Sequence, residues 1–262
     1  MIEQSQDISD RLLAPLNEQQ RAVVRAPLGC ARLVLAGPGS GKTRTLVHRV
    51  AHLMHTGVPA ERILLVTFTN KAAREMMARC EQLCGSAAWS LMGGTFHGLA
   101  AKLFRQYGSV LGLDPEFRIL DRADTEDQLR AAVADLGLDL RKDGLPRVRT
   151  LCRMFSTSVQ REVDLEASIR RQWPQYHQQL VLIRAIGARF VERKHQAGVL
   201  DFDDLLVGWS LLADPPAGAE PEVQQASQVL RERFVEVLVD EYQDTNAIQG
   251  RIADHMASIG QG

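Results

Sequence analysis

The chain has 262 residues, of which 31 are Lys or Arg and 32 are Asp or Glu, and 45% are hydrophobic. This balance excludes a chain that is disordered as a whole, and the net charge of −1 argues against a protein built mainly to coat nucleic acid. No apolar run approaches the ~18–20 residues of a membrane-spanning helix, and the polar, acidic N-terminus lacks the features of a secretory signal. Four cysteines do not make a disulfide framework in a chain of this length, so we expect a cytoplasmic protein with reduced thiols.

The charge is unevenly distributed along the chain. Residues 141–194 carry 12 Lys and Arg against five Asp and Glu. Such a block can be a surface that faces nucleic-acid phosphates, and it can equally be the solvated face of helices. The sequence leaves both interpretations open.

The first third of the chain alternates between strand and helix patterns. The apolar run Ala31–Gly37 predicts a strand, and the helical spacing of apolar residues over Lys42–Thr56 predicts a helix. Arg62–Thr69 reads as a buried strand, followed by a helix over Lys71–Leu83 that Asn70 can cap. This alternation predicts βαβ units on a parallel sheet.

The pattern then changes. Over residues 108–198 helical periodicity dominates, as in Thr125–Leu136 and Tyr176–His195, which indicates a helical insertion. Val235–Asp240 again has the pattern of a buried strand, so we expect the first subdomain to resume near Val199.

A glycine-rich turn stands between the first predicted strand and its helix. The sequence Ala36-Gly-Pro-Gly-Ser-Gly-Lys-Thr43 suits a phosphate-binding loop, because glycines let backbone N–H groups turn toward phosphate oxygens at a helix N-terminus. Lys42 would supply a full charge to the β- and γ-phosphates, and the Thr43 hydroxyl suits a Mg²⁺ ligand position. The alternative is a strand-to-helix turn without a ligand.

Two carboxylates follow the last predicted strand. Asp240 and Glu241 lie at the C-terminal end of Val237–Val239, which in an open parallel sheet is the edge where ligands bind. Asp240 is placed to hold Mg²⁺, and Glu241 could activate a water molecule as a general base. An acidic turn after a buried strand is the simpler reading of these two residues alone.

Several stretches together resemble the UvrD/Rep/PcrA-like superfamily 1 DNA helicases, in the order in which that family has them. They are Leu16–Gln20, Ala36–Arg44, Thr67–Ala73, Gly94–His97, Leu200–Asp204 and Val239–Thr245. The resemblance implies an α/β fold, a RecA-like P-loop NTPase with a parallel sheet flanked by helices and a mainly helical inserted subdomain. It further implies a discontinuous ATP-binding domain 1A over residues 1–107 and 199–262, truncated at its C-terminal end, and a helical subdomain 1B over 108–198.

The resemblance implies ATP and Mg²⁺ as cofactors. Gln20 would read the adenine, Glu241 and Lys42 would be catalytic, and Gln243 would relay between nucleotide and DNA. The metal would be held by Thr43 and Asp240. The remaining nucleotide contacts would come from the loop and the start of its helix, at Gly37, Pro38, Gly39, Ser40, Gly41, Lys42, Thr43 and Arg44.

Two further stretches resemble the DNA-contacting motifs of the family. They would bring Thr67, Phe68, Thr69, Asn70, Thr95 and His97 to single-stranded DNA or to a single-strand/double-strand junction. Strand-end packing for Phe68, a helix N-cap for Asn70 and a cap or surface role for His97 are the alternatives.

The implied parent function is an ATP-driven 3′→5′ DNA helicase or translocase of repair or replication. The family's second RecA-like domain is missing from these 262 residues. We therefore expect the chain alone to bind nucleotide weakly and to hydrolyse it poorly. The ATPase front end of a helicase-nuclease subunit and a non-enzymatic DNA-binding fragment remain alternatives, and the oligomeric state stays open.

Overall fold

The computed structural model describes residues 12–29 and 31–257, and the chain divides into two compact units. Unit 1 holds the residues up to Leu99, Leu212–Thr245 and those from Gly250 onward, and unit 2 holds Ala100–Leu211 and Asn246–Gln249. Three helices contribute residues to both units, namely α5 (Phe96–Tyr107), α10 (Phe202–Ala213) and α12 (Ala247–Ala257).

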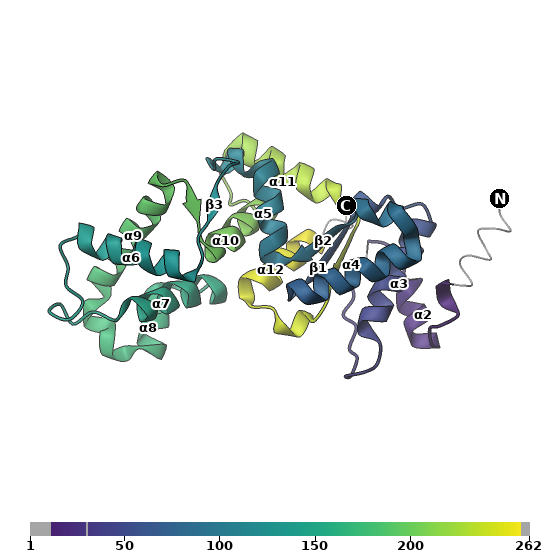
Figure 1. Ribbon diagram of the computed structural model, residues 1–262, viewed down its shortest axis with the longest axis horizontal. Coiled ribbons are helices and arrows are strands. Elements are labelled where there is room, and N and C mark those ends of the chain that lie inside the picture. Colours follow the sequence, from purple (N-terminus) through teal and green to yellow (C-terminus); the bar gives the residue numbers. More distant parts are fainter. Residues whose placement is uncertain (1–11, 30, 258–262) are drawn as a thin grey trace. The chain divides into compact units, whose positions relative to one another are not determined.

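Unit 1 is built on a parallel sheet with the strand order β2–β1–β5 (Figure 1). The strands are β1 (Ile63–Thr67), β2 (Met92–Thr95) and β5 (Glu236–Val239). The unit's own helices are α2 (Glu18–Val24), α3 (Lys42–His55), α4 (Asn70–Cys84) and α11 (Pro221–Arg233). This arrangement confirms the predicted α/β class with a parallel sheet flanked by helices.

The central strand β1 is buried along its whole length, as the continuous apolar pattern predicts. Because side chains alternate across a strand, Ile63 and Leu65 point to one face, where they join a core formed with α3 and α4. Leu64 and Val66 point to the opposite face and are equally inaccessible to solvent. The sheet is therefore covered on both sides at its central strand.

The predicted strand over Ala31–Gly37 is wrong. In the structure residues 31–37 have no strand pairing, and Leu35 is 86% exposed. An apolar run becomes a strand only when a neighbour takes up its backbone hydrogen bonds, and none of the three strands of the described sheet pairs with this segment.

Strand β2 was not predicted, because the sequence Met92-Gly-Gly-Thr95 reads as a turn rather than a strand. The glycines serve close packing instead. A Cβ atom on Gly93 would lie 2.2 Å from Met77 Sδ of α4, so a larger residue here would require the Met77 side chain to move.

Unit 2 is mainly helical, as predicted. It contains α6 (Arg122–Asp135), α7 (Val148–Arg161), α8 (Leu165–Gln172) and α9 (Leu180–Gln196), with a short parallel pair of β3 (Arg118–Ile119) and β4 (Val199–Leu200). Helices α6, α7, α8 and α9 share one apolar core, which includes Leu129, Leu151, Ile169 and Ile186. The predicted helix over Tyr176–His195 begins later, because a 3₁₀ turn occupies Pro174–Gln179.

The boundaries of the two units fall inside α5 and α10 rather than near residues 107 and 199. Phe104 of α5 and Gly208 of α10 explain this, since a Cβ atom on Gly208 would lie 2.2 Å from Phe104 Cζ. Such close packing joins the two helices within unit 2. The assignment of the units to subdomains 1A and 1B stays a prediction.

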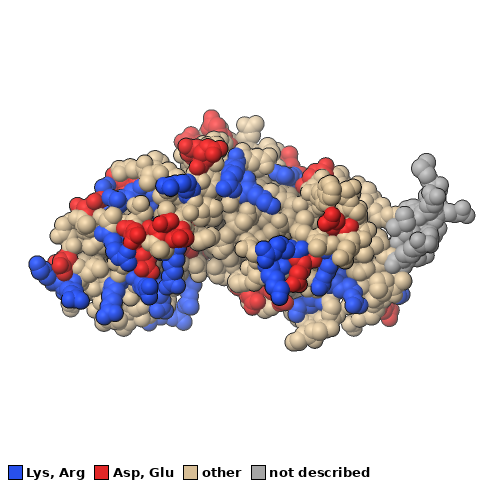
Figure 2. Space-filling view, viewed as in Figure 1, with Lys and Arg blue, Asp and Glu red and all other residues tan. Residues whose placement is uncertain are grey.

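Several basic residues of the block 141–194 form ion pairs with acidic side chains. Arg170 and Arg184 bond Glu166, while Arg189 and Arg193 both bond Asp135. In Figure 2 the basic and acidic side chains are interspersed on the face shown. Part of the local positive charge is thus used in intramolecular ion pairs.

No helix within residues 12–29 and 31–257 combines the length and the apolar character that a bilayer crossing requires. The prediction that the N-terminus is not a secretory signal rests mostly on residues 1–11, which lie outside the described residues.

Candidate nucleotide-binding and DNA-binding site

The predicted motifs meet at one edge of the unit 1 sheet. Thr67 and Thr95 are paired in register at the C-terminal ends of β1 and β2. The N–H group of Asp240, directly after β5, donates to the carbonyl of Val66 at 2.9 Å. Because all three strands are parallel, the segments that follow them emerge on the same side, where an open α/β sheet binds its ligands.

The glycine-rich loop has backbone conformations that favour glycine. Gly39 and Gly41 adopt positive φ angles of 75° and 85°, which residues with a side chain rarely adopt. Gly41 is the N-cap of α3, and Lys42 is the first residue of that helix. The first turn of α3 holds no acidic residue, so its positive dipole end is open to an anion.

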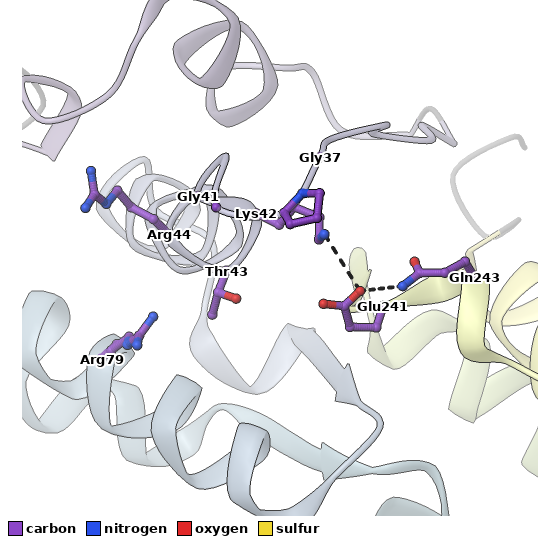
Figure 3. A pocket seen from close by; sticks show the side chains of 10 residues that line it. Gly37, Gly41, Lys42, Thr43, Arg44, Arg79, Glu241 and Gln243 are labelled. Carbon is purple, nitrogen blue, oxygen red and sulfur yellow. Dashed lines mark hydrogen bonds and ion pairs between the residues drawn. The ribbon is translucent and has the colours of Figure 1, made fainter.

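Lys42, Glu241 and Gln243 converge from α3 and from the segment after β5 (Figure 3). Lys42 Nζ lies 3.9 Å from a carboxylate oxygen of Glu241 and 3.4 Å from the carbonyl oxygen of Ala36. Gln243 Nε2 donates to Glu241 at 2.5 Å. The side chains of Lys42 and Glu241 are 28% and 39% exposed, so both can exchange these partners for a ligand.

Asp240 and Glu241 have different environments although they are adjacent. Asp240 is buried, and burial raises the pKa of its carboxyl group, with the negative charge of Glu241 raising the pKa further. The backbone N–H of Glu241 and the charge of Lys42 act in the opposite direction. A carboxylate that is costly to keep charged is suited to a nearby cation.

Glu241 has a left-handed backbone with φ 52° and ψ 44°. This conformation is uncommon for a residue with a long side chain and is often found at functional sites. It turns the chain sharply after Asp240 and separates the exposed carboxylate of Glu241 from the buried one before it.

Gln20 lies beside the phosphate-binding loop. Its Nε2 donates to the carbonyl of Ser40 at 2.8 Å, and its Oε1 accepts from the N–H of Asn17 at 3.0 Å in a reciprocal cap of α2. A Cβ atom on Gly41 would lie 2.8 Å from Gln20 Nε2, so this contact also requires glycine there. Both functional groups of the amide are engaged, and reading an adenine would require their exchange.

A cavity of about 580 Å³ gathers most of the predicted nucleotide-binding residues. Its lining consists of Gly37, Pro38, Gly39, Gly41, Lys42, Thr43, Arg44, Arg79, Glu241 and Gln243. Ser40, Gln20 and Asp240 do not line it. Arg79 of α4 was not predicted, and Figure 3 shows its guanidinium group near Thr43. Since its sequence surroundings are ordinary for a helix, only the packing of α4 on the sheet brings Arg79 to the cavity.

The first predicted DNA motif spans the turn from β1 to α4. Phe68 is half exposed, whereas Thr67 is buried and its hydroxyl donates to the carbonyl of Thr69 at 3.2 Å. The predicted N-cap at Asn70 is wrong by one residue, because Thr69 caps α4 by accepting from the N–H of Ala72. Thr69 is the N-cap because its backbone is extended, whereas Asn70 already has a helical backbone.

The second predicted DNA motif lies at the start of α5. The Thr95 hydroxyl accepts from the N–H of Gly98 at 3.2 Å, and Phe96 is buried next to it. His97 is partly exposed. The sheet therefore brings Thr95 and His97 to the same edge as Thr67 and Phe68, and their contacts with DNA stay predictions.

The residues at this edge suit a magnesium ion. The Asp240 carboxylate and the Thr43 hydroxyl are oxygen donors of the kind that Mg²⁺ prefers, and they follow β5 and begin α3. The raised pKa of Asp240 fits a group whose charge a cation would balance. No cluster of three or more His, Cys, Asp or Glu side chains forms a metal site within the described part of the chain.

The sequence was compared with known proteins. Residues 16–261 match the UvrD/REP helicase N-terminal domain. The chain is 38% identical over 247 residues to DNA helicase II of Escherichia coli, which covers 91% of this chain and 31% of that protein. For the ATP-dependent DNA helicase UvrD1 of Mycobacterium tuberculosis the identity is 36%, over 92% of this chain and 30% of the relative. For the ATP-dependent DNA helicase PcrA of Staphylococcus aureus the identity is 31%, over 94% of this chain and 32% of the relative.

The chain thus spans about a third of the length of these curated relatives. The family match covers nearly the whole chain and includes the glycine-rich loop, both DNA motifs and the carboxylates after β5. The resemblance noted from the sequence is confirmed, and the chain belongs to the UvrD/REP helicase N-terminal domain family.

Proposed function

We propose that the chain is the ATP-binding part of an ATP-dependent 3′→5′ DNA helicase or translocase of DNA repair or replication, acting on DNA in the cytoplasm. The observation that carries this proposal is the convergence of Lys42, Glu241 and Arg79 on one cavity at the sheet edge that also bears the DNA motifs. The names of the relatives, which are all DNA helicases, support it.

In this mechanism the triphosphate of ATP lies over the N-terminus of α3. Lys42 releases Glu241 and places its ammonium group against the β- and γ-phosphates, while the loop N–H groups bind phosphate oxygens. Arg79 adds a second positive charge from the α4 side. Asp240 and Thr43 would hold Mg²⁺, which supplies charge neutralisation at the phosphates.

Glu241 is proposed to accept a proton from the attacking water, whose oxygen bonds the γ-phosphorus as the bond to the β,γ-bridging oxygen breaks. Gln243 donates to Glu241 and would orient its carboxylate. Since Gln243 lies on the segment that follows β5, its displacement would signal the state of the nucleotide toward the DNA motifs. Gln20 would read the adenine after exchanging its bonds to Ser40 and Asn17.

The DNA partner is proposed to be a single strand or a single-strand/double-strand junction. Phe68 offers a half-exposed ring for base stacking, and the polar side chains of Thr69, Asn70, Thr95 and His97 suit the backbone. We propose that a second RecA-like domain is needed for motor action, so that this chain alone is a poor ATPase.

The test is calorimetric titration of the chain with Mg²⁺ and a non-hydrolysable ATP analogue. Binding is expected for the wild type and is expected to fall by about 100-fold or more in Lys42→Ala, since the phosphates lose a full charge in a partly buried site. Lys142→Ala, an exposed lysine in unit 2, is the matched control and should bind as the wild type does. Equal affinity in all three proteins would refute the assignment of the loop.

DNA binding is tested by fluorescence anisotropy of a labelled single-stranded oligonucleotide. Phe68→Ala is expected to weaken binding by about 10-fold, the value of one stacked base. Trp89→Ala removes another exposed aromatic ring of unit 1, outside the DNA motifs, and should have little effect. Binding that is unchanged in Lys42→Ala, together with no detectable nucleotide binding by the wild type, would favour a non-enzymatic DNA-binding fragment.

A further inference from the structure

Arg49 is a buried arginine that neither the sequence motifs nor the proposed mechanism uses. It lies in the third turn of α3 and is only 3% exposed. An arginine cannot give up its charge in a protein, so a buried one needs hydrogen-bond acceptors around it. Its partners show which elements it joins.

The guanidinium group of Arg49 contacts two other elements of unit 1. Its Nε donates to the Glu236 carboxylate, at the first residue of β5, at 2.8 Å. Its Nη1 donates to the carbonyl of Val24, the last residue of α2, at 2.9 Å and also to the carbonyl of Ala26. One side chain thus ties α2, α3 and β5 together.

Each of these elements carries one part of the proposed nucleotide site. Helix α2 carries Gln20, α3 begins with Lys42, and β5 leads into Asp240 and Glu241. Arg49 follows Lys42 by about two helical turns, so the two side chains point to the same side of α3. Lys42 pairs with Glu241 beyond one end of β5, and Arg49 pairs with Glu236 at the other.

The contact at α2 bears on Gln20 in particular. Helix α2 has only seven residues, and its N-terminal end contacts the loop through the bond from Gln20 to Ser40. Arg49 holds its C-terminal end. Arg49 therefore holds α2 at the end opposite the contact between Gln20 and the loop.

We propose that Arg49 is a positioning residue that keeps the adenine-reading, phosphate-binding and metal-binding parts of the site in register. This inference rests on the proposed function. Because the two contacts use different nitrogens, they are separable. The bonds to Val24 and Ala26 position the adenine-reading end, and the bond to Glu236 positions the carboxylates after β5.

Conservative substitutions separate the two contacts. Arg49→Lys keeps a positive charge for Glu236 but cannot also donate to the carbonyls of Val24 and Ala26, because an ammonium group is a point charge without the guanidinium fork. Glu236→Gln removes the charge of the partner in β5 and leaves the bonds to Val24 and Ala26 in place. Arg62→Lys is the matched control, since exposed Arg62 also joins two elements of unit 1 by a bond to the Glu232 carbonyl.

The experiment uses the full 262-residue chain and two ligands in calorimetry, a non-hydrolysable ATP analogue and inorganic tripolyphosphate, each with and without Mg²⁺. Arg49→Lys is expected to lower the affinity for the ATP analogue about 10-fold and to change the affinity for tripolyphosphate less than about threefold. Glu236→Gln is expected to keep the wild-type ratio between the affinity for the ATP analogue and the affinity for tripolyphosphate. The factor by which Mg²⁺ raises these affinities is expected to be several-fold smaller than in the wild type. Arg62→Lys should resemble the wild type.

A purely structural role would lower both affinities by the same factor, in proportion to the folded fraction measured by circular dichroism. That result, or wild-type binding by folded Arg49→Lys and Glu236→Gln, would overturn the inference. If the wild type binds neither ligand, the proposed function itself is wrong and the inference falls with it. If the wild type binds and each variant loses affinity for both ligands by the same factor, the positioning role is refuted and the proposed function stands.

Discussion

Each unit has a lysine that pairs with an acidic side chain, and the two lysines differ in geometry. In unit 2, Lys194 is buried and donates to Asp201 at 2.5 Å and to Asp204 at 2.6 Å. Its ammonium group also lies 4.4 Å from the centre of the Phe190 ring. In unit 1, Lys42 is 3.9 Å from Glu241, and both side chains reach solvent.

The comparison separates charges that stabilise the fold from charges that are available to a ligand. Asp201 and Asp204 cap each other's backbone N–H groups at the start of α10, so the lysine completes a closed hydrogen-bond network. Lys42 has long contacts that an anion can replace. Variants of Lys194 and Asp240 test this difference directly, and variants of Gly208 and His48 test the packing and burial around it, from the largest expected effect to the smallest.

Lys194→Met is expected to destabilise the chain by about 3–5 kcal/mol, because it leaves the buried carboxylate of Asp201 and the partly buried one of Asp204 without their cation. Urea unfolding measures this loss. The control is Lys71→Met, since Lys71 is 83% exposed and 3.9 Å from Glu75, and such pairs contribute less than about 1 kcal/mol. Similar losses for the two variants would break the comparison.

Gly208→Ala is expected to cost about 1–3 kcal/mol despite the better helix propensity of alanine, because the new methyl group meets the rigid, buried ring of Phe104 at 2.2 Å. Gly93→Ala meets Met77 Sδ at the same distance, but this flexible, partly exposed side chain can move aside, and the cost should stay below about 1 kcal/mol. The free energies of unfolding of the two variants show which substitution is more destabilising. A larger loss of stability for Gly93→Ala would contradict the prediction.

Asp240→Asn is expected to abolish the enhancement of nucleotide binding by Mg²⁺ while raising the melting temperature at pH 8. The pKa of Asp240 is raised on folding, so its contribution to stability is complete below the unfolded value and is lost as the pH rises through the folded value. The advantage of the asparagine variant should therefore shrink as the pH falls toward 4. Thermal melts between pH 4 and pH 8 test this, and a variant that is less stable at pH 8 would contradict it.

His48→Gln is expected to have the smallest effect. Burial lowers the pKa of His48 below 6.5, the hydrogen bond to the Leu12 carbonyl opposes this shift, and the charge of Arg44 adds to it. A lowered pKa means that stability is complete above pH 6.5 and decreases as the pH falls below it. Between pH 7.5 and pH 5.5 the melting temperature of the wild type should fall by more than that of His48→Gln. An equal fall for the two proteins would refute the lowered pKa of His48.

The sequence determined the features that depend on neighbours along the chain. The glycine-rich loop, Lys42 at the start of its helix and the carboxylates after β5 all follow from local spacing, because helix caps, turns and strand ends are decided by a few adjacent residues. The helical character of residues 108–198 is visible for the same reason, since helical hydrogen bonds connect residues four apart.

The tertiary structure decided what depends on distant partners. The apolar run at 31–37 does not form a strand, whereas Met92–Thr95 does, because pairing requires a neighbouring strand. Met92–Thr95 lies beside β1, and none of the strands of the described sheet pairs with residues 31–37. Arg79 reaches the cavity and Arg49 joins α2 to β5 only through the packing of their helices. Such contacts link residues as far apart as 49 and 236, and no periodicity along the chain records them.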